Sequence, residues 1–188
     1  IPVFVLHAHR QGVAGDAGLA LLLSLYGIFA ARQVGVEQFT LVTAKLPAGT
    51  PRLRLVQISD LHLGSFMSHD PVRKAVKMIN DQQADLICFT GDLVNERTEE
   101  AIEYLYILKN LYAPMGVISI AGNHDYGDYY RWQNPGDKKK NFEFFRDVHR
   151  ELGWKLLLNE SMTLERGPSA VAVSGEENWS GHGPFTRY

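Results

Sequence analysis

The chain has 188 residues, of which 45% are hydrophobic and 21% charged, and its formal net charge is −2. This composition supports one or two globular domains, and the small negative charge excludes a bulk attraction to nucleic acid, so we expect no nucleic-acid partner. The single cysteine, Cys88, cannot form an internal disulfide, and its place inside an apolar run favours a packing role.

The N-terminal part contains an apolar run over residues 18–31, which extends back to residue 13 with Asp16 as its one acid. About 20 apolar residues are needed to cross a bilayer, so a membrane span, a signal-peptide core and a buried helix all stay open. We favour a hydrophobic helix that anchors the chain as a single N-terminal span, because Tyr26 and Arg32 suit a membrane interface. Basic residues flank both sides of the run, so they do not set its orientation.

A linker separates this part from the rest of the chain. Alternation over residues 36–43 predicts a strand, and residues 46–51 are rich in turn-forming proline and glycine. We therefore expect residues 1–51 to form a membrane-anchor segment and linker, and residues 52–188 to form a separate catalytic domain.

Three β-rich apolar runs in the second part each end in polar residues. The runs are 53–58, 85–90 and 116–121, and they lead into Asp60 and His62, into Gly91 and Asp92, and into Gly122, Asn123, His124 and Asp125. Polar residues after one strand usually only make a turn, but three such clusters in series are unusual. Because open α/β sheets place ligand sites at the carboxyl ends of their strands, we expect these side chains to meet.

Helical patterns alternate with the apolar runs. We expect helices from residue 70, at 98–111 and at 141–152, and strands at 154–158, 162–165 and 170–173. Asp70 can cap the first helix, and Pro71 suits its first turn. Alternation of strands and helices indicates βαβ units and therefore an α/β fold.

The polar clusters have the chemistry of metal ligands. The spacing of Asp60 and His62 puts both side chains on the same side of an extended backbone, and a carboxylate with an imidazole suits Mn, Fe or Zn better than Ca. Asp92 follows a glycine and has two oxygens, so it could bridge two ions, while Asn123 offers an amide oxygen to the second. Two ions about 3.5–4 Å apart can clamp a phosphate and activate a water. His124 could then reach the leaving oxygen, with Asp125 orienting its ring and holding it protonated.

The three clusters resemble the first three motifs of the calcineurin-like metallophosphoesterases. The similarity is greatest to the bacterial membrane-associated branch of that family, which includes UDP-diacylglucosamine pyrophosphohydrolase-like proteins. The resemblance implies a layered β-sandwich flanked by helices, with two divalent ions as cofactors. It assigns Asp60 and His62 to the first metal, Asp92 to the bridge and Asn123 to the second metal. It makes His124 the catalytic acid or phosphate contact and Asp125 the acidic partner of that histidine.

The final motifs of the family do not appear in the chain. They are a Gly-His and a Gly-His-x-His, and together they supply three further histidine ligands. Gly181-His182 is superficially similar but lacks the second histidine, so we interpret His182 as a loop residue. We therefore expect a C-terminally truncated fragment with an incomplete sandwich. His149 is another late histidine that could complete the site.

One loop, over residues 126–140, combines aromatic residues with Arg131 and three lysines directly after His124. It is either an ordinary surface loop with solvated lysines or a substrate lid in which Arg131 contacts a phosphate.

The function expected is a metal-dependent hydrolysis of phosphoric esters or pyrophosphate linkages by a metal-activated water. The substrate would be a phosphate ester, including lipid-linked or nucleotide-linked ones, and the membrane would be a partner. The alternative is a non-catalytic membrane-associated protein that keeps a truncated phosphoesterase scaffold for binding or assembly.

Overall fold

The computed structural model describes residues 18–24, 26, 35–43, 45, 49–166 and 169–178. The chain divides into two compact units, Ile1–Leu41 and Val42–Tyr188. Residues 18–24 are helical, and none of the helices in the described ranges is both long enough and apolar enough to span a bilayer. Because residues 27–34 lie outside the described part, the N-terminal anchor stays a prediction, as does the boundary at residue 51.

The strand expected at residues 36–43 is wrong. Residues 35–43 adopt no regular secondary structure, and Phe39, Leu41 and Val42 are 92%, 82% and 89% exposed. Alternation alone does not make a strand, because a strand needs a neighbour for its backbone hydrogen bonds.

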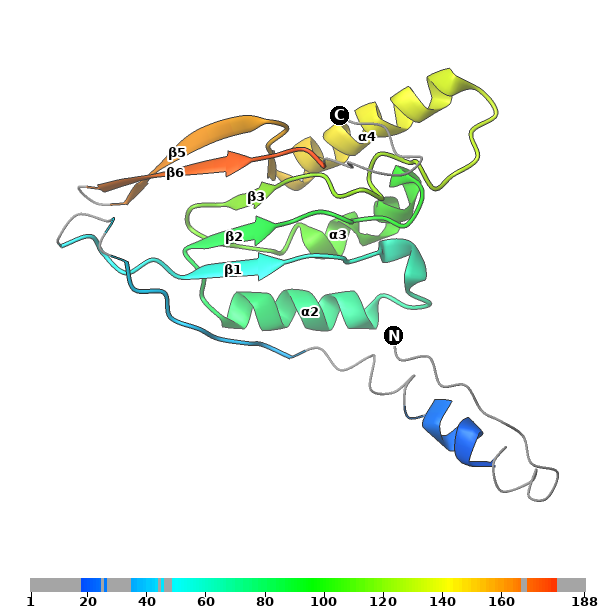
Figure 1. Cartoon of the computed structure of the whole chain (residues 1–188), viewed down its shortest axis with the longest axis horizontal. Coiled ribbons are helices and arrows are strands. Elements are labelled where there is room, and N and C mark those ends of the chain that lie inside the picture. The colour runs from blue at the N-terminus through cyan, green and yellow to red at the C-terminus, as the bar shows by residue number, and fades with distance from the viewer. Residues whose placement is uncertain are drawn as a thin grey trace. The chain divides into compact units, whose positions relative to one another are not determined.

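The second unit is built on a parallel sheet, so the predicted α/β class is confirmed (Figure 1). Its strands, in the spatial order β1-β2-β3-β4, are β1 (Leu55–Ile58), β2 (Leu86–Phe89), β3 (Val117–Ser119) and β4 (Lys155–Leu156). All three neighbouring pairs are parallel. The carboxyl ends of β1, β2 and β3 therefore lie at one edge of the sheet.

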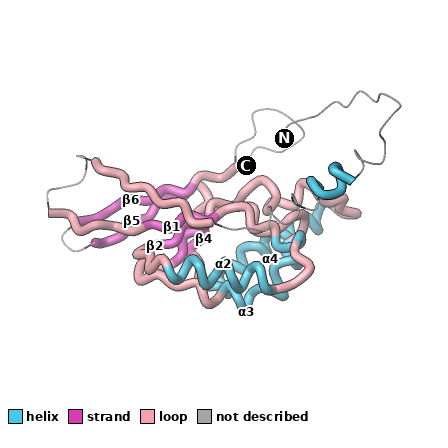
Figure 2. The backbone as a smooth tube through the Cα atoms, turned by 90° about the horizontal axis from the view of Figure 1, so that it is seen from below, coloured by secondary structure: helices cyan, strands magenta, loops and turns pink. Residues whose placement is uncertain are grey.

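Helices cover one face of this sheet (Figure 2). They are α2 (Asp70–Asp81), the 3₁₀ helix η2 (Thr98–Tyr104), α3 (Leu105–Leu108) and α4 (Pro135–Leu152), and a short 3₁₀ helix, η1 (Leu63–Ser65), follows β1. Ile87 and Phe89 of β2 point to this face and join the main hydrophobic core, which buries the apolar side of each helix.

Two helices differ from the expectation. The helix expected at residues 98–111 is a 3₁₀ helix followed by one α-turn, and η2 is tied at its start by the Asn141 side chain, whose Oδ1 accepts the Thr98 N–H at 2.8 Å. The last helix begins at Pro135 rather than at Asn141, because proline suits the first turn of a helix. It ends at Gly153, whose φ of 72° only glycine adopts at little cost.

An antiparallel hairpin covers part of the other face. It consists of β5 (Glu160–Arg166) and β6 (Ser169–Gly175), and Leu164 packs with Leu86, Ile118 and Leu157 in a second, smaller core. At the end of β6 a Cβ on Gly175 would lie 2.4 Å from Leu157 Cβ. The hairpin backbone thus approaches the sheet too closely for any side chain at this position.

Candidate metal centre

The site is built from left-handed turns at the carboxyl ends of the strands. Asp60 and His62, after β1, have φ of 56° and 44°, and Asp92, after β2, has φ of 59°. Residues other than glycine rarely adopt this conformation, which costs about 1–3 kcal/mol and is concentrated at functional sites. Backbone bonds of 3.0 Å from Asp60 N to Gly91 O and from His62 N to Asp92 O hold the two turns together.

Two glycines allow the turns after β2 and β3 to touch. A Cβ on Gly91, whose φ is 96°, would lie 2.4 Å from Gly122 N, and a Cβ on Gly122 would lie 2.2 Å from Asp92 Oδ1. Any side chain at either position would push the Asp92 carboxylate away from the third loop. The glycines that precede Asp92 and Asn123 are thus needed for close approach as well as for the bend.

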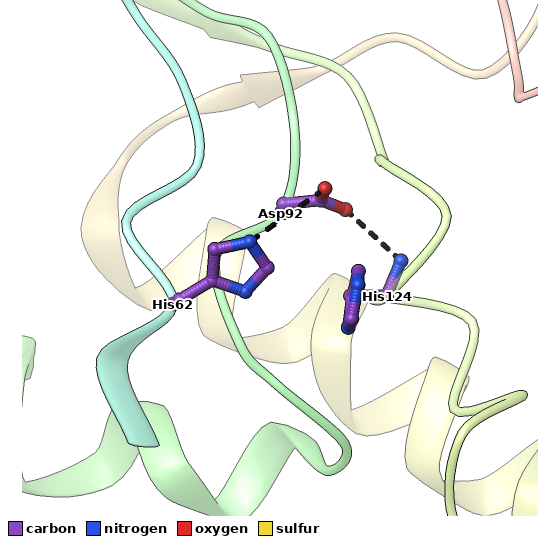
Figure 3. Close-up of side chains that lie close together, drawn as sticks. All are labelled: His62, Asp92 and His124. Atoms are coloured by element: carbon purple, nitrogen blue, oxygen red, sulfur yellow. Dashed lines mark hydrogen bonds and ion pairs between the residues drawn. The ribbon is translucent and has the colours of Figure 1, made fainter. Parts of the chain in front are cut away.

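The structure brings His62, Asp92 and His124 together at this edge of the sheet (Figure 3). One ligand-type atom from each residue lies within 4.8 Å of the others. His62 Nε2 is 3.9 Å from Asp92 Oδ2 and 3.8 Å from Asp60 Oδ1, while Asp92 Oδ1 accepts the His124 backbone N–H at 2.9 Å. Asp60, with a side chain 64% exposed, lies on the solvent side of the group.

The family comparison agrees with this arrangement. The sequence model of calcineurin-like phosphoesterases matches residues 53–188. The chain belongs to the calcineurin-like phosphoesterase family. The predicted membership is confirmed, and the turns after β1, β2 and β3 all lie within the matched residues.

Curated relatives of this phosphoesterase chain come from several bacteria. The UDP-2,3-diacylglucosamine pyrophosphatase LpxG of Chlamydia trachomatis is 41% identical over 123 residues, which are 65% of this chain and 33% of that protein. An uncharacterized metallophosphoesterase of Aquifex aeolicus is 32% identical over 57% of this chain and 41% of its own length. The uncharacterized metallophosphoesterase YkuE of Bacillus subtilis is 32% identical over 51% of this chain and 34% of its own length. The chain thus spans well under half the length of these relatives.

The His124 ring of the phosphoesterase site is held by a backbone carbonyl. Its Nδ1 lies 2.7 Å from Asn95 O, and because a carbonyl oxygen only accepts, Nδ1 carries the hydrogen and Nε2 is left for other partners. The Asn95 loop is itself fixed by Glu100, whose carboxylate accepts the backbone N–H groups of Asn95, Glu96 and Arg97 at 2.7–3.0 Å.

Asp125 has a different role from the one expected. Its carboxylate is fully buried and accepts backbone N–H groups at 2.8–3.3 Å from Asp92, Leu93, Val94 and Gly122. Asp125 therefore joins the turns after β2 and β3, whereas the ring of His124 is oriented by Asn95; this corrects the predicted pairing of His124 with Asp125. Burial raises the pKa of Asp125 to about 7, although the backbone N–H groups of Gly122, Val94 and Asp92 lower it.

Arg131 is exposed, and the structure describes no contact that joins it to His62, Asp92 or His124 within residues 49–166. The three lysines after it belong to the first turns of α4 rather than to a loop. Arg131 as a phosphate contact therefore stays a prediction.

The late histidines differ in their position. His149 is 1% exposed, and both of its ring nitrogens have partners, with Nδ1 2.9 Å from Phe145 O and Nε2 2.9 Å from Ser119 Oγ. It lies in the core and cannot complete the metal site. His182 lies outside the described residues.

Two participants were missed in the sequence. The Asn95 carbonyl, which holds the His124 ring, cannot be recognised from the sequence, because every residue has a backbone carbonyl. Tyr129 stacks on the His124 ring and accepts a hydrogen bond from Asn123; its place in an aromatic-rich loop after the third cluster was the one available signal.

The donor set fits a divalent transition metal. The imidazole nitrogens of His62 and His124 and a carboxylate oxygen of Asp92, which converge from separate turns, are ligand types that divalent transition metals accept. The left-handed turns at His62 and Asp92 further support a fit, because the side chains that they carry converge with His124.

Proposed function

We propose that the chain carries the metal-binding half of a hydrolase for phosphoric esters or pyrophosphate linkages. The observation that carries the proposal is the convergence of His62, Asp92 and His124 from the turns after three adjacent parallel strands. Membership of the calcineurin-like phosphoesterase family supports the same reaction class.

Residues of the three turns would share two ions. Asp60 and His62 would hold one ion, Asn123 would hold the other, and the Asp92 carboxylate would serve both. Two divalent ions, when bound, supply Lewis acidity that neutralises phosphate charge and lowers the pKa of a water molecule. Further donors would come from the protein beyond these turns.

His124 would handle the proton. Because its Nδ1–H is committed to the Asn95 carbonyl, Nε2 is the nitrogen that can give a proton to the leaving oxygen or bond to the phosphate. Asp125 would act indirectly, since its bonds to the Asp92 and Gly122 backbone hold the two turns at a fixed separation.

We infer a lipid-linked pyrophosphate as the substrate class. The support is the similarity to LpxG, which is named a UDP-2,3-diacylglucosamine pyrophosphatase. The apolar N-terminal run fits a protein held at a membrane, and the sheet with its hairpin fits the layered sandwich of the family.

A non-catalytic scaffold is the second candidate, but a specific observation speaks against it. A protein that only bound a partner would have no need to keep strained, non-glycine residues at Asp60, His62 and Asp92.

The test uses the natural full-length protein with Mn²⁺ and bis-p-nitrophenyl phosphate. We expect metal-dependent hydrolysis that is abolished by chelation and by Asp92→Asn. A folded, metal-loaded protein that hydrolyses neither this ester nor a diacylglucosamine-linked pyrophosphate would contradict the proposal and support the scaffold.

A further inference from the structure

We propose that Tyr129 is a positioning residue that sets the orientation of both the Asn123 amide and the His124 ring. The inference rests on the proposed function, in which Asn123 is a metal donor and His124 handles a proton. It assigns a role to the loop between β3 and α4, which lies outside the three turns of the site.

The first contact fixes the Asn123 side chain. Asn123 Nδ2 donates to Tyr129 Oη at 2.7 Å. An asparagine amide presents nitrogen on one side and oxygen on the other, so a partner for Nδ2 determines where Oδ1 points. Without that partner the amide could turn over and present N–H groups, which cannot bind a cation.

The second contact fixes the His124 ring. The Tyr129 and His124 ring centroids are 4.0 Å apart, and the two planes are only 10° from parallel. The Asn95 carbonyl holds Nδ1 at the edge of the same ring, and His62 meets it edge-on with centroids 4.7 Å apart. Together these contacts restrict both torsion angles of His124, so Nε2 keeps one direction.

The loop that presents Tyr129 is tied to its surroundings on both sides of that residue. Trp132 Nε1 donates to Gly127 O at 2.7 Å, which closes the loop on itself. Asp128 pairs with Lys138 in the first turn of α4, and both side chains are largely buried, at 14% and 28% exposed.

The neighbour of Tyr129 is tied as well. The Arg97 guanidinium lies over the Tyr130 ring, 4.8 Å from its centroid, and Trp132 packs edge-on against the same ring. Tyr129 is thus carried by a loop that side-chain contacts hold on both sides of it.

One residue therefore links a metal donor to the proton-handling histidine. The partners that orient metal ligands are worth about 10–100-fold in metal affinity or activity when they are removed. The hydroxyl and the ring of Tyr129 serve different partners, so two substitutions can separate the two effects.

The test compares Tyr129→Phe, which keeps the stacked ring but loses the hydroxyl, with Tyr129→Leu, which loses both. Tyr112→Phe is the matched control, because it removes the hydroxyl of a tyrosine that is 73% exposed and lies on a different loop. In the metal-free protein, the ring protons of His124 should resonate upfield from the Tyr129 ring current in wild type and Tyr129→Phe, and at ordinary positions in Tyr129→Leu.

Calorimetric titration with Mn²⁺ alone tests whether the Tyr129 hydroxyl orients the Asn123 amide. We expect Tyr129→Phe to lower the affinity of one Mn²⁺ about 10-fold, and Tyr112→Phe to bind as wild type does. In turnover, Tyr129→Leu should reduce kcat further than Tyr129→Phe does, with KM little changed, because the stack serves the proton step.

Two results would overturn the inference. Unchanged Mn²⁺ affinity in Tyr129→Phe would show that Tyr129 does not position the Asn123 amide. Unshifted His124 resonances in the wild-type protein would show that Tyr129 does not stack on His124. Failure of the proposed function is distinguishable, since a wild-type protein without hydrolytic activity would still give the resonance and titration results.

Discussion

Two histidines next to the same strand have opposite surroundings. His124 follows β3 at the edge of the sheet, where its Nδ1 is held by Asn95 and its Nε2 is left for a ligand. His149 of α4 packs against β3 from the helix side, and both of its nitrogens have partners within the core. The two histidines differ in one ring nitrogen: the fold leaves Nε2 of His124 to a ligand, whereas it uses both nitrogens of His149.

The carboxylates repeat this contrast. Asp125 directs both oxygens into the protein and meets backbone N–H groups, while Asp92 turns Oδ2 towards His62 and the shared site. Buried polar groups are normally satisfied by the protein, so a group of titratable side chains with unused atoms marks the place where a ligand belongs.

Of the two histidines, the one at the edge of the sheet should have the larger effect on turnover. We expect His124→Ala to lower turnover by about 10²–10⁴-fold, the usual contribution of general acid catalysis, with much less change in metal content. The loss should be smaller for nitrophenyl than for alkyl esters, because a good leaving group departs without a proton. Steady-state rates on both esters and elemental analysis would check this.

The outcomes of that experiment separate three roles for His124. Equal losses on both esters would indicate phosphate binding instead of acid catalysis. Loss of a metal ion would make His124 a ligand, as its place in the cluster with His62 and Asp92 also allows.

The interior histidine should control stability rather than catalysis. Burial lowers the pKa of His149 from 6.5 to about 4, so the unfolded chain binds its proton first as the pH falls. Stability that is fully present above pH 6.5 is therefore lost towards pH 4, by roughly 3 kcal/mol. The pKa of Asp125 is raised from 3.8 to about 7, so the folded protein binds this proton first. Asp125 therefore adds stability as the pH falls from 7 to 3.8.

Urea unfolding of wild type and His149→Gln at pH 7 and pH 4.5 isolates the histidine, because the Asp125 contribution is common to both proteins. Between pH 7 and pH 4.5 the variant should lose less unfolding free energy than the wild type does. A constant difference would mean that His149 does not stay neutral in the folded state.

The smallest effect tests the packing of the hairpin against the sheet. Gly175→Ala should destabilise the protein by about 1–3 kcal/mol, because the new Cβ would lie 2.4 Å from Leu157 Cβ and 2.8 Å from Ile120 Cγ2. Gly136→Ala, where nothing lies within 4 Å of a new Cβ, is the control and should be neutral. Thermal unfolding of both variants checks this, and equal melting temperatures would contradict the close packing.

Much of the fold could be predicted because β1, β2 and β3 come from β-rich runs followed by turns, and β2 and β3 are largely buried. The form of η2 could not, since it depends on the distant Asn141 side chain that binds Thr98. The strand at residues 36–43 failed for a similar reason: pairing is a property of the whole fold.

The meeting of His62, Asp92 and His124 was predictable, but the contacts around them were not. Spacing along the chain indicated that His62, Asp92 and His124 would meet, because parallel strands end together. It could not indicate that Asp125 turns inward, since adjacent residues in a tight turn can point in opposite directions. The stack of Tyr129 on His124 depends on ties between its loop and α4 that only tertiary structure creates.

The central claim is that the turns after β1, β2 and β3 form one metal centre with Asp92 at its middle. Elemental analysis of the natural full-length protein and its Asp92→Asn variant, both purified after Mn²⁺ loading, tests it most directly. We expect two ions per chain in the wild type and impaired occupancy of both sites in a variant that is still folded. Two ions retained in Asp92→Asn would contradict the account.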